Sequence, residues 1–168
     1  MSETNTKYCK RCDTTKPITE FHRDKKSKDG YAFYCKDCTR EYGKRYREST
    51  RGVYNALVGR MNFYHTKPVI ISYKEFKDWW ENVPRICVYC GISEEDVIKL
   101  DDSYNSQNDR LTIDCVDNYV GYKEGNIVLA CRRCNNMKSD LLNFEQMRYI
   151  GRNFLRPIWE KQLGKKIV

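Results

Sequence analysis

The sequence predicts a small α+β protein in which flanking helices surround a strand–loop–strand–helix core. Residues 110–140 contain two short apolar runs, a turn-rich loop between them and a helix-forming segment after them. Apolar residues elsewhere recur at helical spacing, as Val53, Leu57 and Met61 do. The chain has 168 residues, of which 40% are hydrophobic. This length and composition favour one domain, or one domain with a small appendage, around a modest core.

The central segment predicts its elements in a fixed order. A strand-like run at 111–113 ends at Asp114, and a second run at 127–130 is apolar and partly β-branched, as strands are. The second run leads directly into residues 131–138, which can open a helix. The loop between the two runs contains residues that favour turns: Asp117, Asn118, Gly121, Tyr122, Gly125 and Asn126.

Cysteine spacing predicts two zinc sites. Eight of the nine cysteines form four CxxC pairs, in which two intervening residues let both thiolates face one tetrahedral ion. Paired in order they give two four-cysteine sites: Cys9, Cys12, Cys35 and Cys38, then Cys87, Cys90, Cys131 and Cys134. The N-terminus lacks the apolar core of a signal peptide, so we expect a reducing, cytoplasmic location, where metal sites outnumber disulfides. Disulfides and a thiol-based redox protein are the alternatives, and Cys115 belongs to none of the four CxxC pairs.

Residues 1–50 are expected to form an N-terminal zinc unit followed by a basic helix, and residues 51–168 the second domain. The net charge of +8 favours a polyanionic partner. In the predicted helix, basic residues alternate with Tyr42 and Tyr46 and are candidates for contact with a phosphate backbone. These are Arg40, Lys44, Arg45, Arg47 and Arg51. The alternative is a solvated helix face with a tyrosine seam toward the core.

Several further signals mark helix boundaries. Ser72 and Glu75 form a capping-box pattern before Phe76, Trp79 and Trp80, for which core packing is favoured over base stacking. Ser93 and Asn143 are each followed by a short helical pattern, and Pro157 is expected to interrupt the last helix. The C-terminal GKKIV is expected to be frayed. No apolar run approaches the roughly 18 residues of a membrane span, so no membrane association is expected.

The central segment resembles the ββα-metal (HNH) nuclease superfamily, in the version that ends in CxxCN followed by Lys. The resemblance extends to its rare-cutting restriction endonucleases and phage homing endonucleases. It includes the YCGISE segment at 89–94 and the G-Y…N…ACxxCNxxKS block at 121–139. It implies a small ββα-metal core with two four-cysteine zinc sites, in which residues 51–168 form the nuclease domain.

The resemblance also implies the residues of the site. Asp114 and Asn135 stand where the family places the ligands of a catalytic Mg²⁺ or Mn²⁺, and Asn126 stands at the middle asparagine that fixes the loop. Cys115 occupies the usual position of the histidine base. Tyr122 is the first candidate for the base, since a tyrosine is thought to start cleavage in a rare-cutting relative. Asp117, Cys115 and His65 are weaker candidates for this role.

The implied function is metal-dependent hydrolysis of double-stranded DNA by a sequence-specific restriction or homing endonuclease. Arg132, Arg133 and Lys138 would then grip the phosphate, and a palindromic site would imply a homodimer. The implied setting is a bacterial or phage-infected cell. The alternative is a catalytically impaired zinc protein that binds nucleic acid, with Cys115 marking a lost base.

Overall fold

The computed structural model describes residues 5–64, 68–100 and 110–167, with the backbone alone for residues 60–64. The chain divides into two compact units, Met1–Ala56 and Leu57–Val168. The division falls inside helix α2 (Thr50–Tyr64). His65 and residues 101–109 lie outside the described residues.

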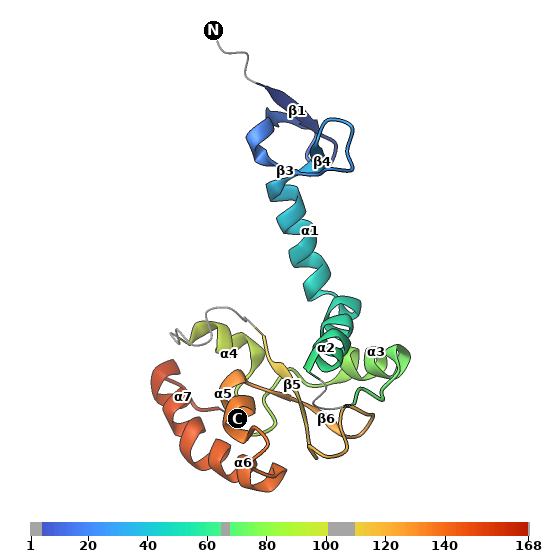
Figure 1. Ribbon diagram of the computed structural model, residues 1–168. Coiled ribbons are helices and arrows are strands. Elements are labelled where there is room, and N and C mark those ends of the chain that lie inside the picture. The colour runs from blue at the N-terminus through green and yellow to red at the C-terminus, as the bar shows by residue number, and fades with distance from the viewer. Residues whose placement is uncertain (1–4, 65–67, 101–109, 168) are drawn as a thin grey trace. The chain divides into compact units, whose positions relative to one another are not determined.

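Two small antiparallel hairpins build the first unit (Figure 1). Strands β1 (Thr6–Cys9) and β2 (Thr14–Pro17) form one, and β3 (Phe21–Arg23) and β4 (Tyr31–Cys35) form the other, with the 3₁₀ turn η1 (Ile18–Glu20) between them. Their buried cluster consists of three cysteines and one aromatic ring, with Tyr31 packed against it: Cys9, Phe21, Cys35 and Cys38. So small a cluster stabilises little by itself, and a metal ion bound by its cysteines would add the missing stability.

Helix α1 (Lys36–Glu48) begins inside the second CxxC pair and ends at Glu48, so Arg51, expected in the same basic helix, lies in the first turn of α2. Ser49 explains this end. Its backbone N–H donates to the carbonyl oxygens of Arg45 and Tyr46. Its hydroxyl accepts the Gly52 N–H at 3.1 Å, which caps the next helix. A side chain at Gly52 would lie 1.8 Å from the Tyr46 carbonyl oxygen, so only glycine permits this corner.

Unit 2 begins with elements whose caps match the sequence signals. Helix α3 (Tyr73–Asn82) carries the complete Ser72–Glu75 capping box and buries Phe76 and Trp80, which confirms their assignment to the core. Helix α4 (Glu94–Lys99) is capped by the Ser93 side chain. Between these helices lies the Cys87–Cys90 knuckle, where the N–H of Val88 donates to the Leu129 carbonyl oxygen at 2.9 Å.

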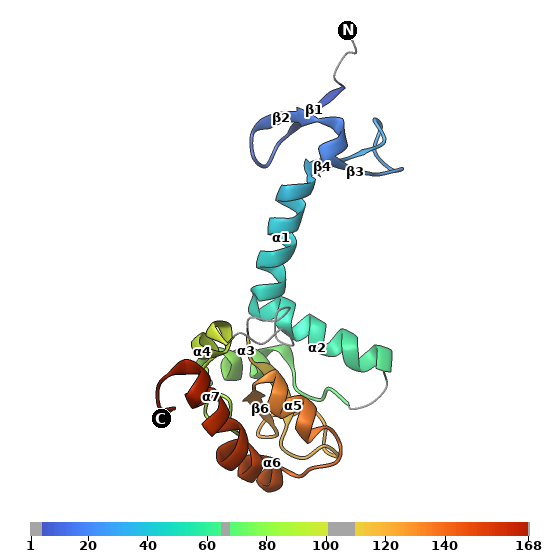
Figure 2. The same cartoon turned by 90° about the vertical axis from the view of Figure 1, so that its left-hand side faces the viewer.

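The strand–loop–strand–helix core lies where the sequence predicts it. Strands β5 (Thr112–Cys115) and β6 (Ile127–Ala130) pair antiparallel, with Asp114 opposite Val128. Helix α5 (Arg132–Lys138) follows β6 after one residue, and its N-cap Cys131 accepts the Cys134 N–H. Figure 2 shows α5 beside the short β6 arrow. Because the strands are only four residues long, helix and zinc ligands must help to hold them.

The C-terminal helices differ from two expectations. Helix α6 (Phe144–Ile150), the π-helical turn η2 (Gly151–Leu155) and α7 (Arg156–Leu163) follow one another without a break, so Pro157 does not interrupt the helix. Pro157 instead lies in the first turn of α7, directly after the π turn, where a missing N–H is tolerated. The tail is also anchored rather than frayed: Lys165 pairs with buried Asp96 at 2.8 Å, and Ile167 is buried. No helix in the described ranges is long and apolar enough to cross a membrane.

Candidate metal and catalytic centre

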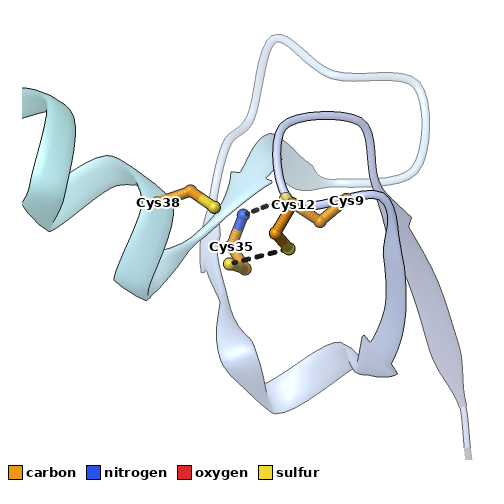
Figure 3. Close-up of side chains that lie close together, drawn as sticks. All are labelled: Cys9, Cys12, Cys35 and Cys38. Carbon is orange, nitrogen blue, oxygen red and sulfur yellow. Dashed lines mark hydrogen bonds between the residues drawn. The ribbon is translucent and has the colours of Figure 1, made fainter.

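The first four-cysteine cluster is assembled from both hairpins and from α1 (Figure 3). The ligand sulfurs of Cys9, Cys12, Cys35 and Cys38 all lie within 4.8 Å of one another, and the Sγ atoms of Cys12 and Cys35 are 4.0 Å apart. Zn–S bonds of about 2.3 Å in a tetrahedron place sulfurs ~3.8 Å apart. The cluster therefore has the size and chemistry of a zinc site.

The second cluster is fully buried and ties the Cys87–Cys90 knuckle to the start of α5. The sulfurs of Cys87, Cys90, Cys131 and Cys134 again lie within 4.8 Å, with 3.8 Å between the Sγ atoms of Cys90 and Cys131. Both clusters pair their cysteines in the order that the sequence predicts. Two groups of this kind fit two structural zinc ions per chain.

The cysteine thiols within a cluster differ in pKa, and a bound metal would make the ionised forms easier to hold together. Burial opposes ionisation of Cys9, but hydrogen bonds from the backbone of Cys12, Cys35 and Arg11 hold its pKa at about 6. Burial, and then hydrogen bonds with the neighbouring thiols, raise the pKa of Cys38 to about 12. Four crowded thiols cannot all ionise without a cation. A zinc ion held by these sulfurs would supply that charge, and protons would compete with it for the same sulfurs.

Asp114 and Asn135 are brought to the same face of β5. Thr112 and Asp114 share a face because side chains two apart on a strand point the same way. The Asn135 amide nitrogen donates to the Thr112 hydroxyl at 2.9 Å, so α5 lies against that face. Since Nδ2 is committed to Thr112, Oδ1 is the atom that Asn135 can offer a cation. The two side chains therefore do not face away from each other.

Asp114 is buried within a network that the sequence did not reveal. The hydroxyl of Tyr89 donates to Asp114 Oδ2 at 2.6 Å, and the Lys138 ammonium lies 3.4 Å from the same oxygen. Oδ1 accepts the Cys115 backbone N–H at 2.8 Å. Burial, then the hydrogen bond to Asp114, raises the pKa of Tyr89 far above its usual range, so the hydroxyl stays protonated as a donor.

Tyr89 is fixed by contacts of both its ring and its backbone. It lies between the zinc ligands Cys87 and Cys90, and its ring packs on Phe144 with centroids 5.4 Å apart. A side chain at Gly151 would meet the Tyr89 backbone at 2.7 Å, so this glycine lets η2 pack directly on the knuckle. In the sequence, Tyr89 is marked only by its position between two cysteines. That position does not reveal a hydrogen-bond partner 25 residues away.

Lys138 was predicted to contact phosphate, but its surroundings in the structure are different. Its side chain is fully buried, and its ammonium donates to the Cys115 carbonyl oxygen and to Asn118 Oδ1, both at 2.9 Å. With Asp114 as the third partner, the ammonium is committed inside the protein. Arg132 and Arg133 remain half-buried on the same helix.

Asn126 braces the loop between the strands. Its side chain donates to the carbonyl oxygens of Asp117 and Gly121, at 2.9 and 2.7 Å, and accepts the Asp117 N–H at 2.9 Å. Asp117 is exposed and caps the turn by accepting the Tyr119 N–H. Tyr122 follows Gly121 directly, is 8% exposed, and accepts the N–H groups of Ile70 and Ile71 on its carbonyl oxygen. The backbone before Tyr122 is therefore fixed by Asn126.

The remaining predicted residues fall into two environments. Cys115 is fully buried, and its carbonyl oxygen holds Lys138. The basic residues predicted to contact a phosphate backbone are all exposed: Arg40, Lys44, Arg45, Arg47 and Arg51. Tyr42 and Tyr46 are 55% and 43% exposed, so within unit 1 they do not form the alternative seam toward a core.

Among solved structures, the chain is similar to the rare-cutting HNH restriction endonuclease PacI. The two sequences are 25% identical, the match covers 94% of this chain and 96% of that chain, and the TM-score is 0.55. The chain has an HNH-like α+β fold. The fold class and the resemblance seen in the sequence are thereby confirmed. No family model and no curated protein matches the chain.

The donor set of this HNH-like core fits a hard divalent cation. Asp114 Oδ1 accepts one backbone N–H, and the Asn135 amide uses its nitrogen on Thr112 and keeps its oxygen as a ligand, so each residue can offer an oxygen. Mg²⁺ prefers such oxygens and fills its remaining positions with water or phosphate. Thiolates prefer zinc, so the two kinds of metal would separate by ligand chemistry.

Tyr89→Phe tests whether the knuckle tyrosine positions Asp114. The substitution keeps the ring on Phe144 and removes only the donor to Oδ2, so zinc content is expected to stay at two ions per chain. Loss of one buried hydrogen bond to a charged group costs about 1.5–3 kcal/mol. We expect a lower melting temperature and a higher Mg²⁺ concentration for half-maximal cleavage. Tyr149→Phe, on an exposed tyrosine of α6, is the control, and equal behaviour of the two variants would contradict this role.

Proposed function

We propose that the chain is a metal-dependent endonuclease that hydrolyses phosphodiester bonds in double-stranded DNA. The observation that supports this most is the convergence of Asp114 and Asn135 on one face of an HNH-like core. A likeness at 25% identity to a restriction endonuclease agrees with DNA as the substrate. Sequence-specific cleavage, as a restriction or homing enzyme, is the finer form of the proposal, and a homodimer would follow if the target is palindromic.

The proposed division of labour follows from the site. A Mg²⁺ or Mn²⁺ ion, when bound, would stabilise charge on the phosphate and the leaving oxygen. Asp114 and Asn135 would hold it, while contacts from Tyr89 and Lys138 keep the Asp114 carboxylate oriented. Arg132 and Arg133 would bind the scissile phosphate from α5. The basic residues of α1 would contact the flanking backbone.

Tyr122 remains the proposed base. Its backbone is fixed by the brace of Asn126 on Gly121, which is what a residue aimed at substrate requires. Cys115 is less suited, because it is 0% exposed whereas Tyr122 keeps 8% of its surface exposed. Tyr122→Phe should slow cleavage by about 10²-fold or more, in line with loss of general-base catalysis, and leave DNA affinity unchanged. An unchanged single-turnover rate would remove Tyr122 from this role.

The alternative function is nucleic-acid binding without catalysis, and the burial of Cys115 at the usual base position favours it. Supercoiled plasmid incubated with zinc-loaded protein and Mg²⁺ or Mn²⁺ separates the two functions. We expect nicked and linear products that depend on the added metal. Tight binding of duplex DNA with no cleavage in either metal would instead support the alternative.

A further inference from the structure

Arg11 is held between two exposed tyrosine rings in the first unit. Its guanidinium carbon lies 5.0 Å from the centre of the Tyr34 ring and 4.6 Å from that of Tyr42. The three side chains come from the first cysteine knuckle, from β4 and from α1. We call Arg11, Tyr34 and Tyr42 the arginine clamp. Within unit 1 it joins every part that the zinc cluster holds together.

The clamp is preorganised. Arg11 lies between the ligands Cys9 and Cys12, and its own backbone N–H hydrogen-bonds to the Cys9 sulfur. A guanidinium stacked on rings keeps its planar fork of N–H donors directed outward. Tyr34 and Tyr42 are 43% and 55% exposed, so the clamp lies at the surface of the unit. Little side-chain entropy would then be lost when Arg11 binds a partner.

Charge distinguishes Arg11 from the cations of α1. Arg40 pairs with Asp37 at 3.5 Å, Lys44 with Glu48 at 4.0 Å and Arg45 with Glu41 at 3.8 Å, so that helix partly neutralises itself. In the described part of the chain, no ion pair joins Arg11 to a carboxylate. Aromatic rings orient a cation without cancelling its charge. The clamp therefore presents an oriented positive charge.

We propose that the arginine clamp is a DNA-contacting element, in which Arg11 donates two parallel hydrogen bonds to a pair of acceptors on duplex DNA. The pair is either two phosphate oxygens or the O6 and N7 atoms of guanine, which share this planar geometry. This inference rests on the proposed function for its partner. It assigns to Arg11 a larger share of the affinity than to Arg40, Lys44 and Arg45, each of which is paired with a carboxylate on α1.

The test measures duplex binding by full-length, zinc-loaded protein without added Mg²⁺ or Mn²⁺, so that no cleavage occurs. Arg11→Ala is expected to weaken binding about 10- to 100-fold. Arg11→Lys keeps the charge but loses the planar fork, and should recover only a small part of that affinity. Lys10→Ala, next to Arg11 in the same knuckle, removes one charge outside the clamp and should weaken binding only about two- to threefold. Zinc analysis of each variant confirms that the knuckle is intact.

A duplex made only of A·T pairs distinguishes the two acceptors. An equal loss for Arg11→Ala on A·T and mixed duplexes indicates phosphate, whereas a loss confined to mixed duplexes indicates guanine. Equal affinities of Arg11→Ala and Lys10→Ala would overturn the clamp proposal while leaving the nuclease proposal intact. If the wild-type protein binds no duplex at all, both proposals fail together.

Discussion

Replacing Asp114 with asparagine is expected to lower the rate of DNA cleavage by about 10³-fold or more. The amide keeps the shape of the carboxylate and can still accept the Tyr89 hydroxyl, but it loses the charge that holds a divalent cation. Loss of several kcal/mol of metal-dependent stabilisation corresponds to a rate change of this size. Plasmid nicking at saturating Mg²⁺ measures the effect, and cleavage near the wild-type rate would contradict the role of Asp114.

Asp114→Asn is also expected to destabilise the fold. A second substitution separates the effect on stability from the effect on cleavage. The Lys138 ammonium is fully buried, so neutralising Asp114 leaves it without a counter-charge, at a cost of about 3–5 kcal/mol. Asp114→Asn combined with Lys138→Met removes both charges and should recover much of the lost melting temperature. The double variant should cleave as slowly as Asp114→Asn alone. Recovery of cleavage together with stability would mean that Asp114 has only a structural role.

Cys134→Ala is expected to have the largest effect on stability. It breaks the buried cluster that joins the Cys87–Cys90 knuckle to α5, so zinc content should fall from two ions per chain to one. Structural zinc contributes about 10–16 kcal/mol in small peptides, which matches the whole stability of a typical domain. We therefore expect unit 2 to lose its cooperative unfolding transition and the chain to lose cleavage.

Cys115→Ala provides the matched control for the zinc prediction. Cys115 is as buried as Cys134 but belongs to neither cluster. The variant should keep two zinc ions and lose only about 1 kcal/mol, the usual cost of a small buried truncation. Metal analysis and thermal denaturation check both variants. Loss of zinc from Cys115→Ala, or two ions retained in Cys134→Ala, would contradict the assignment of the ligands.

Local signals in the sequence were sufficient for much of the fold. Cysteine spacing fixes which thiols can share an ion, so both clusters were predicted in full. The Ser72 cap and the apolar run at 127–130 act over a few residues and were predicted correctly. The prediction that Pro157 interrupts the last helix was wrong, because the effect of this proline depends on the π-helical turn before it. In that turn Gly151 packs on the Tyr89 backbone.

The parts of the site that depend on long-range contacts could not be predicted. Lys138 resembles a surface cation in the sequence, and only the fold shows that α5 turns it inward onto Asp114. Tyr89 resembles a spacer between two zinc ligands until its hydroxyl is seen on the same carboxylate. Both contacts join residues more than 20 positions apart, and no local pattern encodes such a pairing.

The central claim is that Asp114 and Asn135 together hold a divalent cation at the junction of β5 and α5. Anomalous diffraction from crystals grown with Mn²⁺ and duplex DNA tests it most directly. We expect a manganese peak within about 2.0–2.3 Å of both an Asp114 carboxylate oxygen and Asn135 Oδ1, distinct from the two zinc peaks. Crystals with DNA bound and no manganese between these two side chains would contradict it.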